Sequence, residues 1–181
     1  MSLQTMLKAA SSVVLIAAAA AGQGTPAPTP AAKPAMSNYA IPIGTSVSID
    51  DAKKASAAAS AEAKKNGWFM AIAVVDPAGT LVYFEKADTT QHGSVQVAID
   101  KARSAALYKR PTKAFQDALE KGGANLRILS LQGAVPVDGG SPLLVQGKLT
   151  GAIGVSGDLA EHDGQCATAG AAALTTTTVA R

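Results

Sequence analysis

GAIGVSG, residues 151–157, is the stretch of sequence that decides the fold. Its apolar, β-branched residues mark a strand, but its glycines weaken a strand because they have no side chain to pack. Glycine is tolerated inside a strand where another backbone or a flat ligand comes close. Two explanations stay open: helices that pack closely on this strand, and a binding slot at the Gly154 and Gly157 end that opens onto the start of the last helix.

Two β-hairpins are expected around this stretch. Residues 142–146 and 149–156 form one of them, across Gly147 and Lys148, and a short strand over 134–137 precedes it. The other joins the apolar runs 68–75 and 80–86. Its connection is Asp-Pro-Ala-Gly, in which proline at the second position and glycine at the fourth are typical of a type I turn.

Four helices are expected beside the hairpins. They cover residues 48–66, 93–109, 112–120 and 161–174. Ser48 and Thr112 are suited to cap the first and third, and Gly67 ends the first. Alanines recur at spacings of three and four on the first, second and last helices, which predicts close packing against neighbours. Helices grouped with two hairpins predict an α+β fold, in which helices pack on an antiparallel sheet.

The N-terminal residues are expected to lie outside this domain. Residues 1–21 contain one cation, Lys8, followed by a charge-free apolar run that ends in small residues, as in a secretory signal peptide. The apolar run is too short to cross a bilayer, so no stable membrane insertion is expected. Residues 22–37 are rich in proline and alanine and predict an extended linker. The folded domain then covers 38–181, in a periplasmic or secreted protein.

Composition excludes several classes of function. The net charge is only +3 and aromatic residues make up 4% of the chain, so neither a basic footprint nor a stacking surface for nucleic acid is present. The single cysteine, Cys166, excludes an internal disulfide and a CxxC zinc site, and its position predicts a buried small hydrophobe. No nucleophile–base–acid set is visible, so the sequence favours binding over catalysis.

A series of motifs, in this order and spacing, resembles the GlcG/HbpS-like family, which also occurs at the C-terminus of PduO-type corrinoid adenosyltransferases. The motifs are AVVDPAG (73–79), KARSAA (101–106), RPT (110–112), GGSP (139–142) and GAIGVSG (151–157). The resemblance implies a three-layer sandwich with about five strands and helices on both faces, assembled into a homo-oligomer, a dimer or larger. It also implies binding of haem or a related tetrapyrrole, with slow haem degradation in some members.

The candidate haem site combines an apolar slot, an iron ligand and cations for the propionates. His92, in the loop before the second helix, is a candidate iron or anion ligand. The alternative interpretation is a solvated loop histidine that binds nothing. The resemblance points to Thr112 as an oxygen ligand for iron. The alternative interpretation is that Thr112 only caps the third helix. Tyr108 and Arg110 could serve iron and propionate respectively, and Gly154 and Gly157 mark the slot. A solvated face or an interface salt bridge is expected for Lys101 and Arg103.

Two further functions are compatible with the sequence. One is a binding or catalytic domain for a small oxygenated carboxylic acid, held by amides near Gly139 and Gly140 or near Ser156 and Gly157. The other is a purely structural oligomeric module. The leading hypothesis is an exported haem- or tetrapyrrole-binding protein that scavenges, buffers or senses its ligand.

Overall fold

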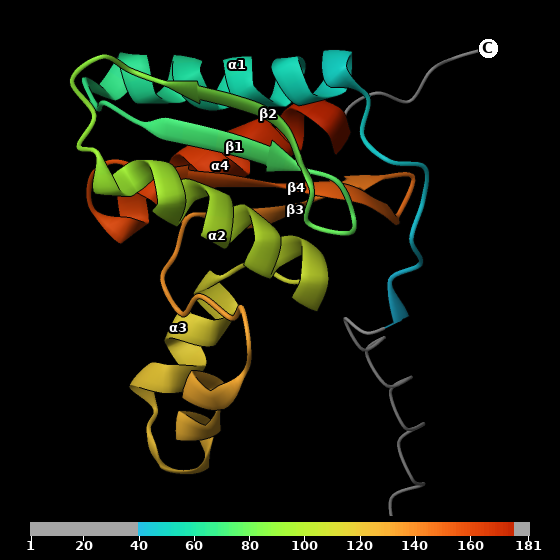
Figure 1. Ribbon diagram of the computed structural model, residues 1–181, viewed down its shortest axis with the longest axis vertical. Coiled ribbons are helices and arrows are strands. Elements are labelled where there is room, and N and C mark those ends of the chain that lie inside the picture. Colours follow the sequence, from blue (N-terminus) through green and yellow to red (C-terminus); the bar gives the residue numbers. More distant parts are fainter. Residues whose placement is uncertain (1–39, 176–181) are drawn as a thin grey trace, which may run out of the picture. The chain divides into compact units, whose positions relative to one another are not determined.

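A four-stranded antiparallel sheet in the order β2-β1-β4-β3 forms the middle layer of the structure, a computed structural model that describes residues 40–175 (Figure 1). Its strands are β1 (Ala71–Val75), β2 (Leu81–Lys86), β3 (Gly140–Val145) and β4 (Lys148–Ser156). Helices α1 (Ile49–Asn66) and α4 (Ala160–Thr175) cover one face, and α2 (Gly93–Tyr108) covers the other. The expected three-layer α+β sandwich is therefore confirmed.

A small helical arm leads from the end of α2 back to the sheet. It contains α3 (Lys113–Glu120) and the 3-10 helix η2 (Gly123–Ser130), which pack against each other. The prediction of a strand over 134–137 is wrong, because this segment is irregular. The sheet therefore has four strands, where about five were expected. Pro136 has no N–H to give to a ladder, and the amide of Val135 donates to the Ser104 hydroxyl of α2 at 3.0 Å.

Local sequence explains where the elements begin and turn. The Ser48 hydroxyl accepts a hydrogen bond from the amide of Asp51 at 3.1 Å, and Gly67 ends α1 with φ of 76°. The expected turn between β1 and β2 is present, and the Asp76 carboxylate accepts from the amides of Ala78 and Thr80. Between β3 and β4, Gln146 and Gly147 both have positive φ, as a two-residue hairpin requires.

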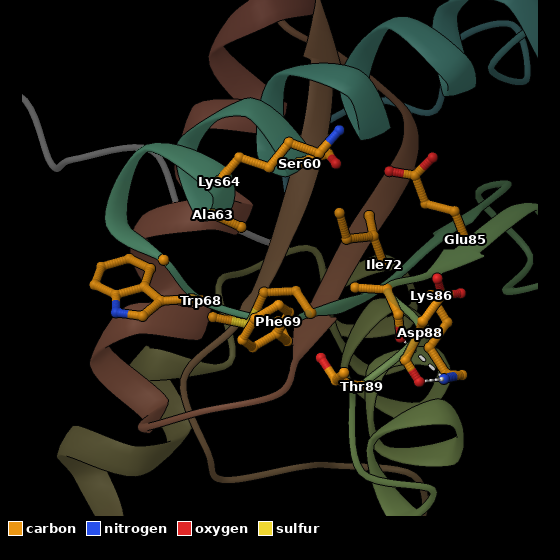
Figure 2. Close-up of a pocket in the computed structure, with 13 residues that line it drawn as sticks. Ser60, Ala63, Lys64, Trp68, Phe69, Ile72, Glu85, Lys86, Asp88 and Thr89 are labelled. Atoms are coloured by element: carbon orange, nitrogen blue, oxygen red, sulfur yellow. Dashed lines mark hydrogen bonds between the residues drawn. The ribbon is translucent and has the colours of Figure 1, made fainter.

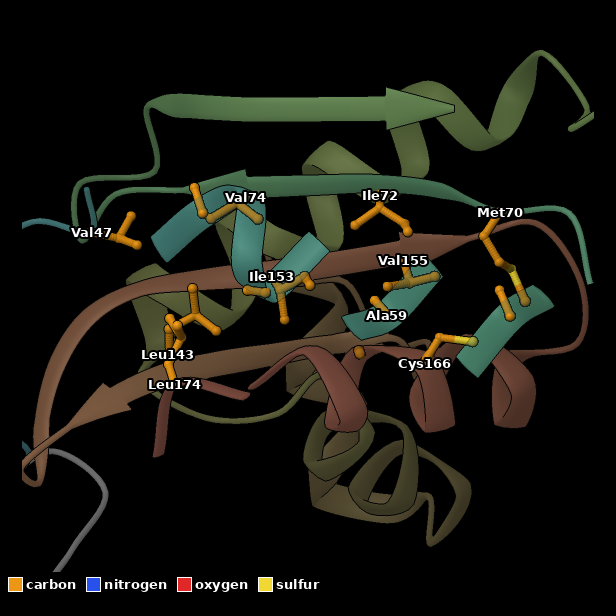
Figure 3. Close-up of a cluster of buried hydrophobic side chains, with 14 residues drawn as sticks. Val47, Ala59, Met70, Ile72, Val74, Leu143, Ile153, Val155, Cys166 and Leu174 are labelled. Carbon is orange, nitrogen blue, oxygen red and sulfur yellow. The ribbon is translucent and has the colours of Figure 1, made fainter. Parts of the chain in front are cut away.

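The alternation of side chains in β1 creates two apolar cores. Ile72 and Val74 point toward α1 and α4, into a core that includes Val155 and Cys166 (Figure 3). The alanines and Val75 of the same strand point toward α2, where they meet helix alanines. The expectation for Cys166 is confirmed, because its side chain is fully buried and burial raises the pKa of the thiol to about 12.

Gly154 is explained by the close approach of α2. A Cβ at this position would collide with the carbonyl oxygen of Ala98 and the amide nitrogen of Ala102. The glycine therefore lets the helix backbone lie against β4, as the first of the two explanations for GAIGVSG requires. Gly154 lines none of the three cavities described below, of about 720, 220 and 580 Å³.

The prediction that Lys101 lies on a solvated face is wrong, because Lys101 of α2 is buried. Its side chain is 1% exposed, and its Nζ donates to Asp163 Oδ2 at 2.7 Å and to the Val155 carbonyl at 3.2 Å. Burial raises the pKa of the Asp163 carboxyl, although the Lys101 ammonium acts in the opposite direction. This ion pair joins α2 to α4 past the end of β4.

The proposed signal peptide and linker, residues 1–21 and 22–37, lie outside the described residues. Within residues 40–175, no helix is long and apolar enough to cross a membrane.

Candidate functional site

Several chain segments meet at the end of the sheet where β1 begins and β2 and β4 end. Ala71 lies opposite Lys86 of β2 and opposite Ser156 of β4. The segment after α1, the loop that leads from β2 into α2, and the segment that leads from β4 into α4 therefore come together here. Loops held by rigid elements in this way are common binding surfaces.

A cavity of about 720 Å³ lies here between the C-terminal half of α1 and the β1–β2 edge (Figure 2). Met70, Ile72 and Phe69 give it an apolar floor, and the Phe69 side chain is 56% exposed. Lys64 of α1 and Lys86 of β2 contribute positive charges to the lining, which also holds two acidic residues. The Lys86 ammonium donates to the backbone carbonyls of Ala87 and Asp88, at 2.9 and 3.2 Å. The volume is within the range of small-molecule and cofactor sites. The remaining lining residues are Ser60, Ala63, Gly67, Trp68, Glu85, Ala87, Asp88 and Thr89.

A smaller hollow of about 220 Å³ adjoins this cavity. The two share four lining residues, Gly67, Trp68, Phe69 and Thr89. The others are Thr90, Gln91, Gly157 and Asp158, so the hollow lies at the entry to α2. One ligand can therefore contact both spaces.

A stacked aromatic pair stands beside the smaller hollow. The rings of Trp68 and His162 are 3.9 Å apart between centroids and nearly parallel, at 11°. His162 Nδ1 lies 3.2 Å from Asp158 Oδ2, so the histidine also partners the acidic residue that lines the hollow. This arrangement fixes the wall formed by Trp68 and Asp158.

The structure separates the sequence-predicted site residues into three places. Gly157 lines the smaller hollow; His92 is exposed, directly precedes α2 and lines neither cavity, although its neighbour Gln91 lines the smaller hollow. Gly154 lies under α2, inside the core. Tyr108, Arg110 and Thr112 lie together at the other end of α2, about 24 Å from its start at 1.5 Å per residue.

The corner formed by these three residues is closed by their own contacts. The Tyr108 hydroxyl donates to the Gln132 carbonyl at 2.7 Å, and Arg110 lies over the Phe115 ring. Thr112 is fully buried, and its hydroxyl accepts from the amide of Gly140 at 2.8 Å instead of capping α3. Its role as an iron ligand stays a prediction.

The amides that were expected to hold a small acid already have acceptors. The amide of Gly139 donates to the Asp138 carboxylate at 2.7 Å, and that of Gly140 to Thr112. Next to Gly157, the amide of Asp158 donates to the Asp163 carboxylate at 3.3 Å. Asp138, which is half-buried, also lines a third cavity of about 580 Å³ together with the acidic Asp117 and Glu161. Burial raises the pKa of the Asp138 carboxyl, and this acidic surface disfavours an anion.

Sequence reasoning missed Lys64, Phe69 and Thr90 at the candidate site. Phe69 lies two residues before β1, inside the apolar run 68–75 that the sequence predicts as a strand, so its apolar side chain was taken as part of that strand. Thr90 lies in a polar loop with no local motif. Within residues 40–175, no group of three or more His, Cys, Asp or Glu side chains is placed to hold a metal ion.

Comparison with known proteins identifies relatives over most of the domain. The chain is 36% identical to protein GlcG of Escherichia coli K12 over 100 residues, which is 55% of this chain and 73% of that protein. It is 29% identical over 119 residues to an uncharacterized 15.0 kDa protein of Citrobacter freundii, covering 65% of this chain and 84% of that protein.

Solved structures share the fold. The crystal structure of HbpS superposes with a TM-score of 0.66 at 29% identity, covering 77% of this chain and 98% of that chain. A PduOC–haem complex superposes with a TM-score of 0.64 at 27% identity, covering 71% and 95%. The model of the family described as haem degrading protein HbpS-like matches residues 47–172. The chain therefore belongs to the HbpS-like family.

Proposed function

We propose that this protein binds haem or a related tetrapyrrole in the cavity between α1 and the β1–β2 edge. The observation that carries the proposal is the open cavity of about 720 Å³, with its apolar floor and lysine-bearing rim, in a chain of the HbpS-like family. The haem complex of the similar PduOC structure supports the same class of ligand. Neither Tyr108 nor Thr112 lines the large cavity, the smaller hollow or the third cavity of about 580 Å³.

The residues of the cavity fit a flat, mostly apolar molecule with acidic side groups. Phe69 and Ile72 would contact the macrocycle, and Lys64 and Lys86 would lie near the propionates. Bound haem would supply an iron centre with redox and ligand-binding chemistry. The protein's own part is to exclude water from one face of the macrocycle and to orient its acidic edge.

The iron ligand is best sought near the entry to α2. Among the sequence-predicted ligands, His92 is exposed and lies two residues after Thr90, which lines the smaller hollow. The Thr112 hydroxyl is buried and already bonded. We therefore propose His92 as the axial ligand, and His92→Ala should change the ferric absorption spectrum, whereas Thr112→Val should leave it unchanged.

A hemin titration tests the proposal. The purified chain should give a shifted, saturable Soret band with one haem per chain at micromolar hemin. Phe69→Glu places a charge on the exposed part of the apolar floor and should weaken binding at least tenfold.

The matched control is Ile49→Glu, because Ile49 is similarly exposed, at 47%, and lies at the opposite end of α1. It should bind hemin like the unsubstituted protein. A chain without a Soret shift would refute haem binding, and equal affinities of the two variants would refute the location.

We further propose that the protein is exported to the periplasm or beyond and acts there as a scavenger, buffer or sensor of its ligand. The sequence of residues 1–21 supports export. Mass spectrometry of the protein recovered from the periplasm should find Gly22 as the first residue. A product that retains residues 1–21 in the cytoplasm would contradict export.

The helical arm supports a homo-oligomer. Leu126 and Leu129 of η2 are 52% and 68% exposed, and Leu131 follows at 40%. Light scattering should therefore report a dimer or a larger species. A monomer at micromolar concentration would contradict this proposal.

Degradation of bound haem stays a hypothesis. Loss of the Soret band after addition of a reductant would test it.

A further inference from the structure

We propose that the smaller hollow is a carboxylate subsite, formed by Thr90 and the N-terminus of α2, which holds an acidic group of the ligand seated in the large cavity. The inference rests on the proposed function for that ligand. It adds to the lysines of the large cavity, Lys64 and Lys86, a specific hydrogen-bond partner for one of the acidic groups of the ligand.

Thr90 supplies the first observation. It is 5% exposed and lines the hollow, and within residues 40–175 its hydroxyl has no hydrogen-bond partner. A buried hydroxyl without a partner is costly, so it marks a place where a partner is expected. Ser94 of α2 also has a buried hydroxyl without a partner among these residues, but it lines neither cavity, so the argument rests on Thr90.

The N-terminus of α2 supplies the second observation. The first turn of a helix presents free amides and a partial positive charge, which favour an anion. In the described part of the chain, no side chain caps α2 through a hydrogen bond, and its first turn contains no acidic residue. The amides of Ser94 and Val95 already donate to the carbonyls of Gln91 and His92, at 3.2 and 3.3 Å, so the helix contributes here through the partial positive charge of its N-terminus. The residues Thr89, Thr90 and Gln91, which lead into this helix, line the hollow.

The other helix that begins at this end is different. The Asp158 carboxylate accepts from the amide of Leu159 at 2.9 Å, and Asp163 accepts from the amide of Asp158 at 3.3 Å. The start of α4 is therefore already neutralised by its own carboxylates. This leaves the start of α2 as the end of a helix at this site that still lacks an anion.

The geometry of the two hollows defines the ligand class. The smaller hollow, at about 220 Å³, is suited to a carboxylate rather than to a macrocycle, and it shares Phe69 and Thr89 with the large cavity. Asp158 is the charged residue of its lining, and the carboxylate of Asp158 is already partnered by His162 and by the amide of Leu159; the carboxylate of the ligand is therefore placed on the Thr90 side of the hollow. The site therefore fits a flat apolar body with a carboxylate at one edge.

The test compares hemin with its dimethyl ester, which keeps the macrocycle and iron but has no free carboxylate. Hemin should bind the unsubstituted protein about tenfold more tightly than the ester, the size expected for one hydrogen bond to a charged group. Thr90→Val keeps the shape of the side chain and removes the hydroxyl. It should weaken hemin binding about tenfold and leave binding of the ester unchanged.

Ser56→Ala is the matched control, because Ser56 of α1 is also a buried hydroxyl without a partner among the described residues and lines neither hollow. It should bind hemin and the ester like the unsubstituted protein. Urea unfolding of both variants checks that each folds.

The outcomes separate the subsite from the proposed function. If hemin and its ester bind equally, and Thr90→Val has no effect, the subsite is refuted while haem binding stands. If hemin does not bind but millimolar propionate raises the melting temperature in a Thr90-dependent way, the subsite stands and the haem proposal fails. If propionate and hemin both leave the protein unchanged, both proposals fail.

Discussion

Lys101 shows how much one buried side chain decides. An ammonium with 1% exposure is stable only because Asp163 and a backbone carbonyl surround it. Its burial could have been anticipated from spacing, because Lys101 falls on the same helical face as Ala98, Ala102 and Ala105. What the sequence does not contain is the partner, which lies 62 positions further along the chain.

Removing one member of this pair should strongly destabilise the fold. Lys101→Met leaves the Asp163 carboxylate buried without a cation, and the free energy of unfolding should fall by about 3–5 kcal/mol. Lys101→Met combined with Asp163→Asn leaves no charge and should recover part of this loss. Urea unfolding measures all three proteins.

Lys113→Met provides the matched control for this experiment. Lys113 pairs with Asp117 at a similarly short distance, 2.8 Å, but both side chains are about half exposed. Its loss should change the free energy of unfolding by less than about 1 kcal/mol. A Lys101→Met variant as stable as Lys113→Met would show that the buried pair contributes no more than a surface one.

At the scale of elements, local signals were sufficient for helices and hairpins. The cap at Ser48, the stop at Gly67 and the turn at Asp76 all act between residues close in sequence, and each is present. The strand predicted over 134–137 does not form, because a strand needs a neighbouring strand with which to pair. Its Val135 amide finds the Ser104 hydroxyl of α2 instead, a contact that depends on the path of the whole arm.

The segment that returns from the arm also carries a pH dependence. Burial raises the pKa of the Asp138 carboxyl in the folded protein above its ordinary value. A raised pKa means that this group favours the folded state when protonated, and that the benefit is lost as pH rises through the folded-state pKa.

Asp138→Asn should therefore be more stable than the unsubstituted protein at pH 7. The difference should disappear below the ordinary aspartate pKa of about 3.9, where both side chains are neutral. Parallel urea unfolding between pH 3 and pH 8 measures it. A variant that is less stable at pH 7, or a difference that does not vary with pH, would contradict the assignment.

For the whole molecule, the layers were predictable but the candidate site was only partly so. Gly157 lines the smaller hollow, and His92 lies two residues after Thr90, which also lines it; the binding roles of both stay predictions. Lys64, Phe69 and Thr90 were missed because they meet only when α1, β1 and the entry to α2 are brought together. Tyr108, Arg110 and Thr112 are adjacent in sequence and in space, but they form a closed corner rather than a cavity.

The central claim is that haem lies between α1 and the β1–β2 edge with an acidic group at the start of α2. A crystal structure of the hemin complex tests it most directly. The account predicts density for the macrocycle against Phe69 and Ile72, with one propionate within hydrogen-bond distance of the Thr90 hydroxyl. Density for haem at Tyr108 and Thr112, with an empty cavity beside Phe69, would contradict it.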